Sequence, residues 1–296
     1  MKPDSDSTAS APTPMDKIER AHLIDPADAS HVMYRYASSP DFTGLLQRFW
    51  IPVWSVPPGQ EAVQKVLQYP VCLIVITGQY ARFYGVTSGL STTALTGDGW
   101  AVGLMCAPAA GFLIAKAPVA GYTDRFVEVT DVLGACGEQL VDQVRAAMVT
   151  DPNSAAAHGA AMGAYGVALK AFLPVDAEGE LVNRLVAFVE GNSGVTRVAQ
   201  LAEEFQLSER ALQRLVHRRL GLTPKWLIQR RRLQEAAERL RDHPTTLGEV
   251  AASLGYADQS HFIRDFSRVT SMTPGEFAAL HVPVTGRSPN DRANPS

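Results

Sequence analysis

Residues 198–221 read VAQLAEEFQLSERALQRLVHRRLG, and this stretch decides the fold of the C-terminal third of the chain. A similar stretch, LGEVAASLGYADQSHFIRDF, follows at residues 247–266. The first halves of the two stretches align at an offset of 49 residues and the second halves at 50, so the second copy carries one extra residue between them. An internal repeat of this kind indicates two copies of one supersecondary unit.

Each copy has the pattern of a helix-turn-helix. A short amphipathic helix places a small alanine, Ala202 or Ala251, where a second helix can approach it closely. A tight turn follows, through Gln206 in the first copy and Gly255 in the second. The apolar residues of the next helix recur at helical spacing, which predicts one buried face in each copy.

The second helix of each copy also has a polar face suited to DNA. We expect it to begin at a capping residue, Ser208 in the first copy and Asp258 in the second. Arginine can read guanine bidentately and glutamine can read adenine, while other polar groups contact phosphates. The residues predicted to contact DNA are Ser208, Arg210, Gln213, Arg214, His217 and Arg218 in the first copy and Gln259, Ser260, His261, Arg264 and Arg268 in the second.

One linker helix is expected between the copies, from Trp226 to Leu240, with Thr223-Pro224 as its start. A rigid helix would set the separation of the two reading helices, which must lie about 34 Å apart to meet one face of a duplex. The basic run Arg230-Arg231-Arg232 lies in this helix. It is either a solvated face or a phosphate contact beside the first reading helix. Capping boxes at residues 246–249 and 273–276 predict two further helix starts.

Residues 196 to 281 resemble the paired helix-turn-helix domain of AraC/XylS-type bacterial transcription regulators. The matching features are Leu201-Ala202, Ser208, Leu212, Arg214, Gly221-Leu-Thr-Pro224, Arg232-Leu233, Val250-Ala251, Leu254-Gly-Tyr256, Asp258-Gln-Ser-His-Phe262, Arg264, Phe266 and Thr273-Pro274. Val216 and Ser271 depart from the family, which usually has Phe and Gly there, but neither lies on a reading face. The resemblance implies a sequence-specific DNA-binding transcription regulator with double-stranded DNA as partner, and it leaves contact with RNA polymerase open.

The region from Thr43 to Arg125 is typical of β-structure. Strands are expected at residues 46–54, 71–76, 81–86, 92–95, 100–106, 112–115 and 125–129. Short runs with a turn signal every 8 to 12 residues favour a barrel or sandwich. Its aromatic residues are expected in the core or lining a pocket: Trp50, Trp54, Phe83, Tyr84 and Trp100. This part is also similar, more weakly, to the β-rich sensor domains of the same family, and a small-molecule effector there stays open.

The predicted fold is therefore α+β. A cupin-like β-barrel or sandwich comes first, then a helical connector, then an all-α domain with two helix-turn-helix motifs joined by a linker helix. The expected divisions are a flexible arm at 1–40, a sensor or dimerisation domain at 41–130, the connector at 131–193, the DNA-binding domain at 194–282 and a disordered tail at 283–296. Connector helices are expected at 132–149, 155–172 and 181–190.

Length and composition exclude several classes of protein. The chain has 296 residues, enough for about two domains, and its net charge of −3 excludes a uniformly basic, histone-like protein. Its longest uncharged stretch, Gly99 to Ala115, is too short for a spanning helix and is interrupted by glycine and proline. We expect a cytoplasmic protein without a membrane partner, a metal site or a cofactor, and leave a homodimer open.

Two alternatives to a ligand-responsive regulator remain. One is a regulator that acts through dimerisation alone. The other is a DNA-binding protein with an enzymatic, alkyl-accepting cysteine, which would need an activated thiolate. Cys72, Cys106 and Cys136 all lie in apolar contexts, which predict three buried, unreactive thiols. We therefore expect no enzymatic activity.

Overall fold

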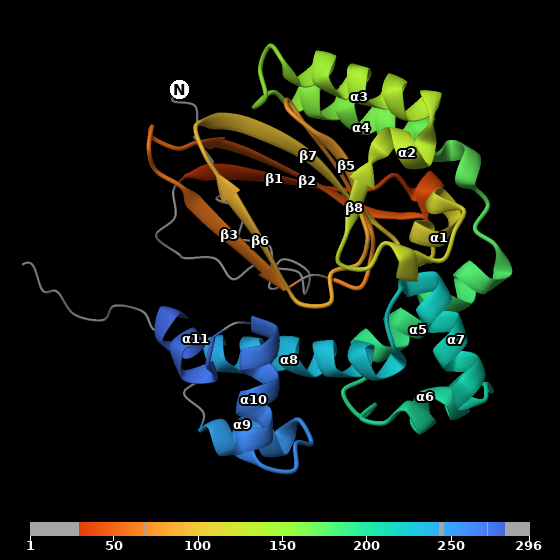
Figure 1. Ribbon diagram of the computed structural model, residues 1–296, viewed down its shortest axis with the longest axis vertical. Coiled ribbons are helices and arrows are strands. Elements are labelled where there is room, and N and C mark those ends of the chain that lie inside the picture. The colour runs from red at the N-terminus through yellow and green to blue at the C-terminus, as the bar shows by residue number, and fades with distance from the viewer. Residues whose placement is uncertain (1–29, 68, 243–245, 271, 282–296) are drawn as a thin grey trace, which may run out of the picture.

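The computed structural model describes residues 30–67, 69–242, 246–270 and 272–281, and it comprises an N-terminal sheet domain and a C-terminal helical part (Figure 1). The strands are β1 (His31–Ala37), β2 (Leu46–Ser55), β3 (Ala62–Leu67), β4 (Leu73–Thr77), β5 (Ala81–Tyr84), β6 (Leu90–Leu95), β7 (Asp98–Cys106) and β8 (Phe126–Glu128). The helices are α1 (Ala110–Ala115), α2 (Val129–Leu133), α3 (Ala135–Met148), α4 (Ala155–Leu169), α5 (Ala177–Gly191), α6 (Val198–Glu204), α7 (Glu209–Leu220), α8 (Pro224–Asp242), α9 (Leu247–Ser253), α10 (Gln259–Thr270) and α11 (Pro274–His281). Short 3-10 turns are η2 (Pro40–Phe42), η3 (Val119–Gly121) and η4 (Lys170–Phe172).

Six strands form one antiparallel sheet in the order β1-β2-β7-β4-β5-β8. Side chains alternate between its two faces, as the pleat of a strand requires. On β2, Phe49 and Ile51 are buried on one face, and Trp50 between them points to the other. The second sheet, β3 paired with β6, lies against this other face. The two sheets thus form an open sandwich, and the expected barrel is not closed.

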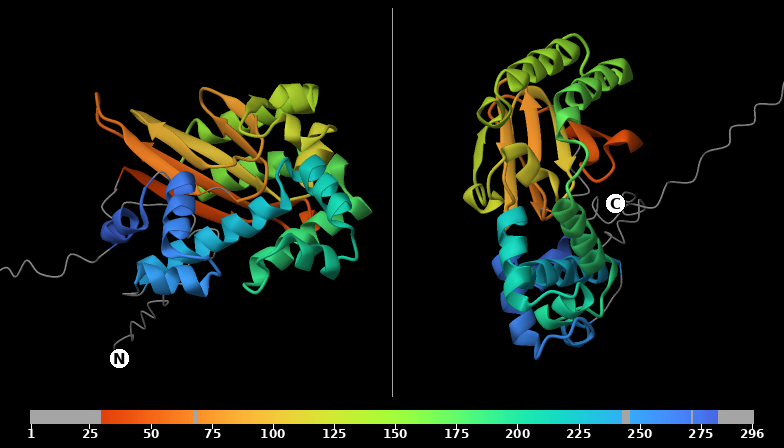
Figure 2. Two further views of the ribbon diagram at one scale, coloured as in Figure 1. Left: turned by 60° about the horizontal axis from the view of Figure 1, so that its bottom comes forward. Right: turned by 90° about the vertical axis from the view of Figure 1, so that its right-hand side faces the viewer.

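Helices α3 and α4 cover the opposite face of the six-stranded sheet (Figure 2). Tyr165 of α4 is fully buried, and its hydroxyl donates to the carbonyl of Val102 at 2.8 Å. Its ring packs edge-on against Phe49 at 5.4 Å between centroids. From α3, Arg145 donates to the carbonyl of Thr77 at 3.1 Å. The predicted connector is therefore part of the domain core as well as a connection.

The C-terminal helices lie beside the sandwich and away from α3 and α4 (Figures 1 and 2). Helix α5 leads out of the N-terminal domain, and α6 with α7 forms the first helix-turn-helix. The long helix α8 then runs beneath the sheets to the second pair, α9 and α10, and α11 packs back on α8. This arrangement confirms the predicted linker helix between two motifs.

Several predicted boundaries in the N-terminal half are wrong. Residues 31–37 of the predicted arm form β1, which pairs with β2 along its whole length. Residues 112–115 belong to α1, because a short buried apolar run fits a helix as well as a strand. Strand β3 had no sequence signal, since its residues alternate without a strongly apolar face. The rest of the predicted arm, up to residue 29, and the predicted tail at 283–296 lie outside the described residues.

Within the described residues, no helix combines the length and apolar character that a membrane span needs.

Replacing Tyr165 by Phe tests how α4 is attached to the sheet. Tyr165→Phe removes the hydroxyl that donates to Val102 and keeps the ring contact with Phe49. The expected loss of unfolding free energy is about 1 kcal/mol, as for a typical buried hydrogen bond. Urea denaturation measures it. Tyr34→Phe is the matched control, because the Tyr34 hydroxyl makes an exposed bond to Asn153 and should change stability little. Equal losses in both variants would contradict this account.

Candidate nucleic-acid interface

The first helix-turn-helix has the turn and cap that its sequence predicts. Helix α6 ends at Glu204 with Phe205 as its C-cap, and Gln206 takes a left-handed conformation with φ of 53°. The Ser208 hydroxyl then accepts a hydrogen bond from the backbone N–H of Ala211 and caps α7. Helix α7 ends at Leu220, and its C-cap Gly221 has a φ of 71°. Ser208 is therefore confirmed as a cap, which leaves its predicted contact with DNA as a proposal.

The second helix-turn-helix repeats this geometry. Gly255 provides the positive φ of the turn at 72°. The Asp258 carboxylate accepts from the backbone N–H of His261 at 2.7 Å, as an N-cap does. The predicted capping boxes are both present, at Thr246 with Glu249 and at Thr273 with Glu276. Both motifs are therefore locally complete helix-turn-helix units.

The side chains predicted to read DNA are exposed on both second helices. On α10, Arg268 forms an ion pair with Asp265 at 2.9 Å, and the His261 ring lies 3.7 Å from the same carboxylate. The Arg264 guanidinium donates to the carbonyl of Ser260. These contacts orient the cationic groups along one exposed face. On α7, Arg210 and Arg214 are likewise exposed, beside Gln213 and His217.

The C-terminal end of α7 is held by α5. Arg219 is buried and pairs with both Asp176 and Glu178, and its guanidinium lies 4.2 Å from the centre of the Phe112 ring. Its neighbour Arg218 pairs with Glu178 as well. Arg218, which the sequence predicts as a DNA contact, is thus engaged at the domain boundary in this structure.

The arginine run in α8 is neither a solvated face nor a phosphate grip, so both sequence interpretations are wrong. Arg230 is 1% exposed, pairs with Glu190 at 2.9 Å and stacks on the ring of Tyr69 at 4.6 Å. Arg231 is buried and donates to the carbonyl of Val195. Arg232 stacks on Tyr256 at 3.9 Å from the ring centre. The run instead joins α8 to its neighbours, because each of the three arginines has a partner from a distant part of the chain.

Two further hydrogen bonds tie the first motif to the N-terminal domain. The indole N–H of Trp226 donates to the carbonyl of Ser88 at 2.9 Å, and the Thr123 hydroxyl donates to the carbonyl of Gly221 at 2.9 Å. Asp124 accepts from both the N–H and the hydroxyl of Ser88, which fixes the receiving loop. The first motif is therefore docked on the sheet domain through backbone groups as well as ion pairs.

The two helix-turn-helix motifs belong to different hydrophobic cores. One cluster runs from the sheet domain through α6 and α7 to Ile228 of α8. A second, separate cluster begins at Leu233 and contains the second motif and Phe277 of α11. The first motif therefore shares a core with the N-terminal domain, whereas the second motif has its own.

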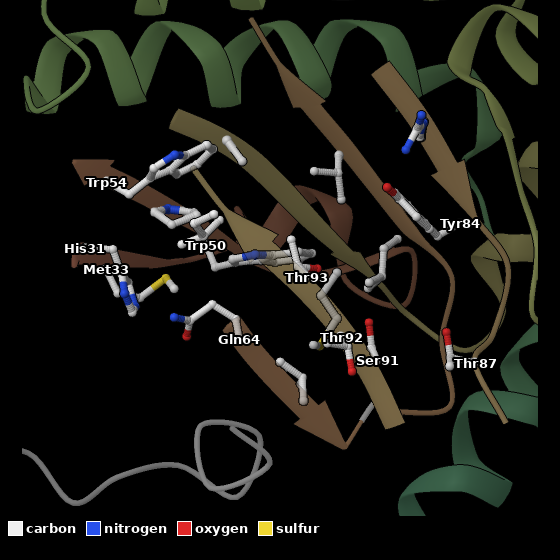
Figure 3. A pocket seen from close by; sticks show the side chains of 18 of the residues that line it. His31, Met33, Trp50, Trp54, Gln64, Tyr84, Thr87, Ser91, Thr92 and Thr93 are labelled. Carbon is white, nitrogen blue, oxygen red and sulfur yellow. The ribbon is translucent and has the colours of Figure 1, made fainter. Parts of the chain in front are cut away.

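A hollow of about 520 Å³ opens between the two sheets of the sandwich (Figure 3). Trp50 and Trp54 project into it from β2, and Gln64 and Thr92 face them from β3 and β6. Tyr84 lines it and Phe83 lies in the core on the other face, and the sequence predicts either position for both residues. The size fits a small-molecule site. The arginines that line it, Arg35, Arg48 and Arg82, were not singled out from the sequence.

The cysteines differ from the sequence expectation at one position. Cys72 and Cys106 are buried, and burial raises the pKa of the Cys72 thiol to about 12 and that of Cys106 well above its ordinary value. Such thiols stay protonated and are poor nucleophiles. Cys136 is exposed, near the start of α3, so its predicted burial is wrong. Among the described residues no group of three His, Cys, Asp or Glu side chains is arranged to hold a metal.

Comparison with known proteins gives separate matches for the C-terminal helical part and for the N-terminal sheet domain. Residues 201–279 match a family described as a helix-turn-helix domain, and residues 34–128 match a family described as a domain of unknown function (DUF6597). The HTH-type transcriptional activator RhaS of Escherichia fergusonii is 33% identical over 96 residues, which are 32% of this chain and 34% of that protein. RhaS of Pectobacterium carotovorum is 31% identical over 94 residues. The chain thus spans about a third of the length of the curated relatives it matches.

Solved structures were also matched. A probable AraC family transcriptional regulator from Rhodopseudomonas palustris is 28% identical, with a TM-score of 0.32, over 35% of this chain and 99% of that one. ToxT from Vibrio cholerae is 12% identical, with a TM-score of 0.37, over 86% of this chain and 98% of that one.

The contact between Arg219 and Asp176 predicts how stability depends on pH. The hydrogen bond from Arg219 is the main cause that lowers the pKa of Asp176 below its ordinary 3.8. A lowered folded pKa adds stability above the unfolded pKa, and this stability is lost as pH falls through the folded value. Asp176→Asn keeps the cap on Gly179 but removes the charge. In urea unfolding its deficit should be constant from pH 8 to 5 and shrink below about pH 4. A deficit that persists unchanged at pH 2 would contradict this.

Thiol accessibility gives a second prediction. A disulfide reagent such as DTNB should modify Cys136 quickly in the native protein and reach Cys72 and Cys106 only after unfolding, because burial protects both. The expected count is one fast thiol in buffer and three in denaturant. Cys136→Ser is the control and should leave no fast thiol. Rapid modification of Cys72 or Cys106 in the folded variant would reopen the enzymatic alternative.

Proposed function

We propose, from the AraC-type helix-turn-helix domain that residues 201–279 form, that the whole chain is a sequence-specific DNA-binding transcription regulator. The observation that carries the proposal is the pair of complete helix-turn-helix motifs, each with an exposed polar face on its second helix. No catalytic step enters this function.

In this proposal, α7 and α10 enter two successive major grooves on one face of the duplex. Arg214 and Arg264, at matching positions of the two helices, read bases, and the other predicted residues on both faces contact bases or phosphates. Helix α8 holds the two reading helices apart. Its many tertiary contacts support this role, because a linker that is packed along its length keeps its orientation.

The regulator is ligand-responsive in this proposal, with a small-molecule effector in the hollow between the sheets. Tyr69 supports the link, because it lines that hollow and also stacks on Arg230 of α8. The ring of Tyr69 thus touches both the candidate ligand site and the helix that joins the motifs. A regulator that acts through dimerisation alone would not need this contact. A thermal-shift screen separates the two, since only a sensor gains stability from a metabolite.

The resemblance to AraC/XylS regulators extends the proposal to the partners. The protein works in the cytoplasm on double-stranded DNA, pairs as a homodimer and contacts RNA polymerase at the promoter. Analytical ultracentrifugation of the full chain, with and without duplex, tests the dimer. A two-hybrid assay against polymerase subunits tests the other contact.

The proposed base contacts predict a matched pair of effects. A duplex is first selected from a random pool with the full chain and then titrated by fluorescence anisotropy. Arg214→Ala and Arg264→Ala should each lose about 1–3 kcal/mol on the selected duplex and relax specificity at one position. Arg184→Ala, which removes an exposed arginine of α5 that is not among the predicted DNA contacts, is the control and should keep full affinity.

The salt dependence of DNA affinity provides a test that can contradict the proposal. Neutralised phosphates release counterions, so affinity must fall steeply as salt rises. Failure to enrich any sequence, or an affinity that does not change with salt, would contradict DNA binding by these faces.

A further inference from the structure

We propose that Asp265 of α10 is a positioning residue, which restrains the charge of Arg268 and so makes the second motif more selective for sequence. The inference rests on the proposed function, because it concerns how α10 meets DNA, and it names a residue outside the predicted DNA contacts. It depends on three observations: a buried carboxylate where the first motif is apolar, the polar groups around that carboxylate, and the partner of the matching arginine in the first motif.

The carboxylate of Asp265 lies where the first motif has an apolar side chain. Residues of α10 align with those of α7 at an offset of 50, so Asp265 corresponds to Leu215. Each of these two residues is 7% exposed, and Phe262 and Phe266 beside Asp265 are fully buried. Burial of a carboxylate is costly unless charged or polar partners surround it. The second motif therefore keeps a charged group where burial alone would favour leucine.

Three polar side chains surround this carboxylate. The Arg268 guanidinium donates to Oδ1 of Asp265 at 2.9 Å. The side-chain amide of Gln229 in α8 donates to Oδ2 at 3.2 Å, and Nε2 of His261 lies 3.7 Å from the same oxygen. The side chain of Arg268 is exposed whereas that of its partner is buried, so the carboxylate anchors the cation to the body of the motif.

A second link from α8 reaches the same histidine. The ring of His261 packs edge-on against Tyr256, with 5.4 Å between the ring centroids. The guanidinium of Arg232 in α8 lies 3.9 Å from the centre of the same tyrosine ring. Helix α8 thus contacts the residues that support the polar face of α10 at two places, through Gln229 and through Arg232. Side chains that are already held in place lose less conformational entropy when they bind DNA.

The matching arginine of the first motif is paired from outside the motif. Arg218 of α7 corresponds to Arg268, and its partner is Glu178 of α5. Both arginines are therefore balanced by a carboxylate, in one motif from a separate helix and in the other from the same helix. The pair on α7 requires α5 to be docked, whereas the pair on α10 depends only on residues of that helix. Asp265 thus restrains the second motif whatever the position of the N-terminal domain.

A restrained arginine changes what α10 offers to DNA. The attraction of cations to phosphates does not depend on sequence and weakens as salt rises. Asp265 reduces this attraction, because it balances part of the charge of Arg268 before DNA arrives. The base contact proposed for Arg264 then makes up a larger share of the binding energy. Removing the carboxylate should strengthen binding to any duplex and lower the preference for the selected one.

The test is fluorescence anisotropy of the full chain with its selected duplex and with a scrambled duplex of equal composition, over a range of salt concentrations. Asp265→Asn keeps the size of the side chain and removes its charge. The slope of log affinity against log salt should steepen by about 0.5 to 1, as for roughly one added phosphate contact. The ratio of the affinities for the selected and scrambled duplexes should fall by at least about threefold, the effect of one ion pair near a surface.

Asp265→Leu is a second variant without the charge, and it introduces the residue that the first motif has at this position. Apolar replacements of buried charges are often neutral for stability, so this variant keeps the test available if Asp265→Asn does not fold. Circular dichroism checks the fold of each variant. Both variants should steepen the salt slope and lower the ratio of affinities.

Three controls separate the restraint of charge from packing and from net charge. Gln229→Leu removes the bond from α8 to the carboxylate and keeps the pair with Arg268, so it should lower stability without steepening the salt slope. Glu203→Gln removes an exposed negative charge of α6 without releasing an arginine and should change the slope by less than about 0.3. In an Arg268→Gln background, Asp265→Asn should no longer steepen the slope, because no arginine remains to be released.

Failure of this inference can be told apart from failure of the proposed function. If the wild-type chain enriches a duplex but both Asp265 variants keep its salt slope and ratio of affinities, the role of Asp265 is wrong and the regulator stands. Weaker binding of both duplexes at an unchanged slope means a structural role alone and also overturns the inference. If the wild-type chain enriches no duplex, the proposed function fails and the inference fails with it.

Discussion

The orientation of helix α8 against the sheet domain depends on one buried charge. The guanidinium of Arg230 is 1% exposed and is held by Glu190 of α5 and the ring of Tyr69. Leaving a buried charge without its partner costs several kcal/mol, so moving α8 away from α5 would be strongly unfavourable. Replacing such an ion pair by apolar groups is often neutral for stability, and its contribution here is to orientation. The ion pair therefore favours the rotation of α8 that aims Arg230 at Glu190.

This constraint lies at the junction between the two cores. The first core ends at Ile228 and the second begins at Leu233, so the arginine run occupies the part of α8 between them. Arg230 faces the sheet domain, and Arg232 faces Tyr256 of the second motif. Two positions of one helix, only two residues apart, therefore contact opposite halves of the molecule. In the proposed function, a shift of Tyr69 at the hollow would therefore act first on α8, the helix that joins the two motifs.

The features that sequence predicts well are those that depend on near neighbours. The caps at Ser208 and Asp258, and the turn at Gly255, need only the residues around them. The arginine run was misread because its partners Glu190, Val195 and Tyr256 are distant in the chain, and nothing in a basic helical stretch indicates burial. The arginines that line the hollow were not identified from the sequence for a similar reason. Arg35 lay in a predicted arm, and only the pairing of β1 with β2 places it opposite Trp50.

The ion pair between Arg218 and Glu178 connects the two proposed activities. Arg218 is on the polar face of α7, yet its partner belongs to α5 of the docked N-terminal domain. A phosphate that binds Arg218 must compete with Glu178, while the adjacent Arg219 stays buried and paired. Competition for one group couples the two equilibria, and such coupling is reciprocal. DNA binding must then weaken the contact of α7 with α5 by the same factor by which that contact weakens DNA binding. A ligand that moves α5 relative to α7 would thereby change affinity for DNA at the first motif directly, alongside its effect on α8 through Tyr69.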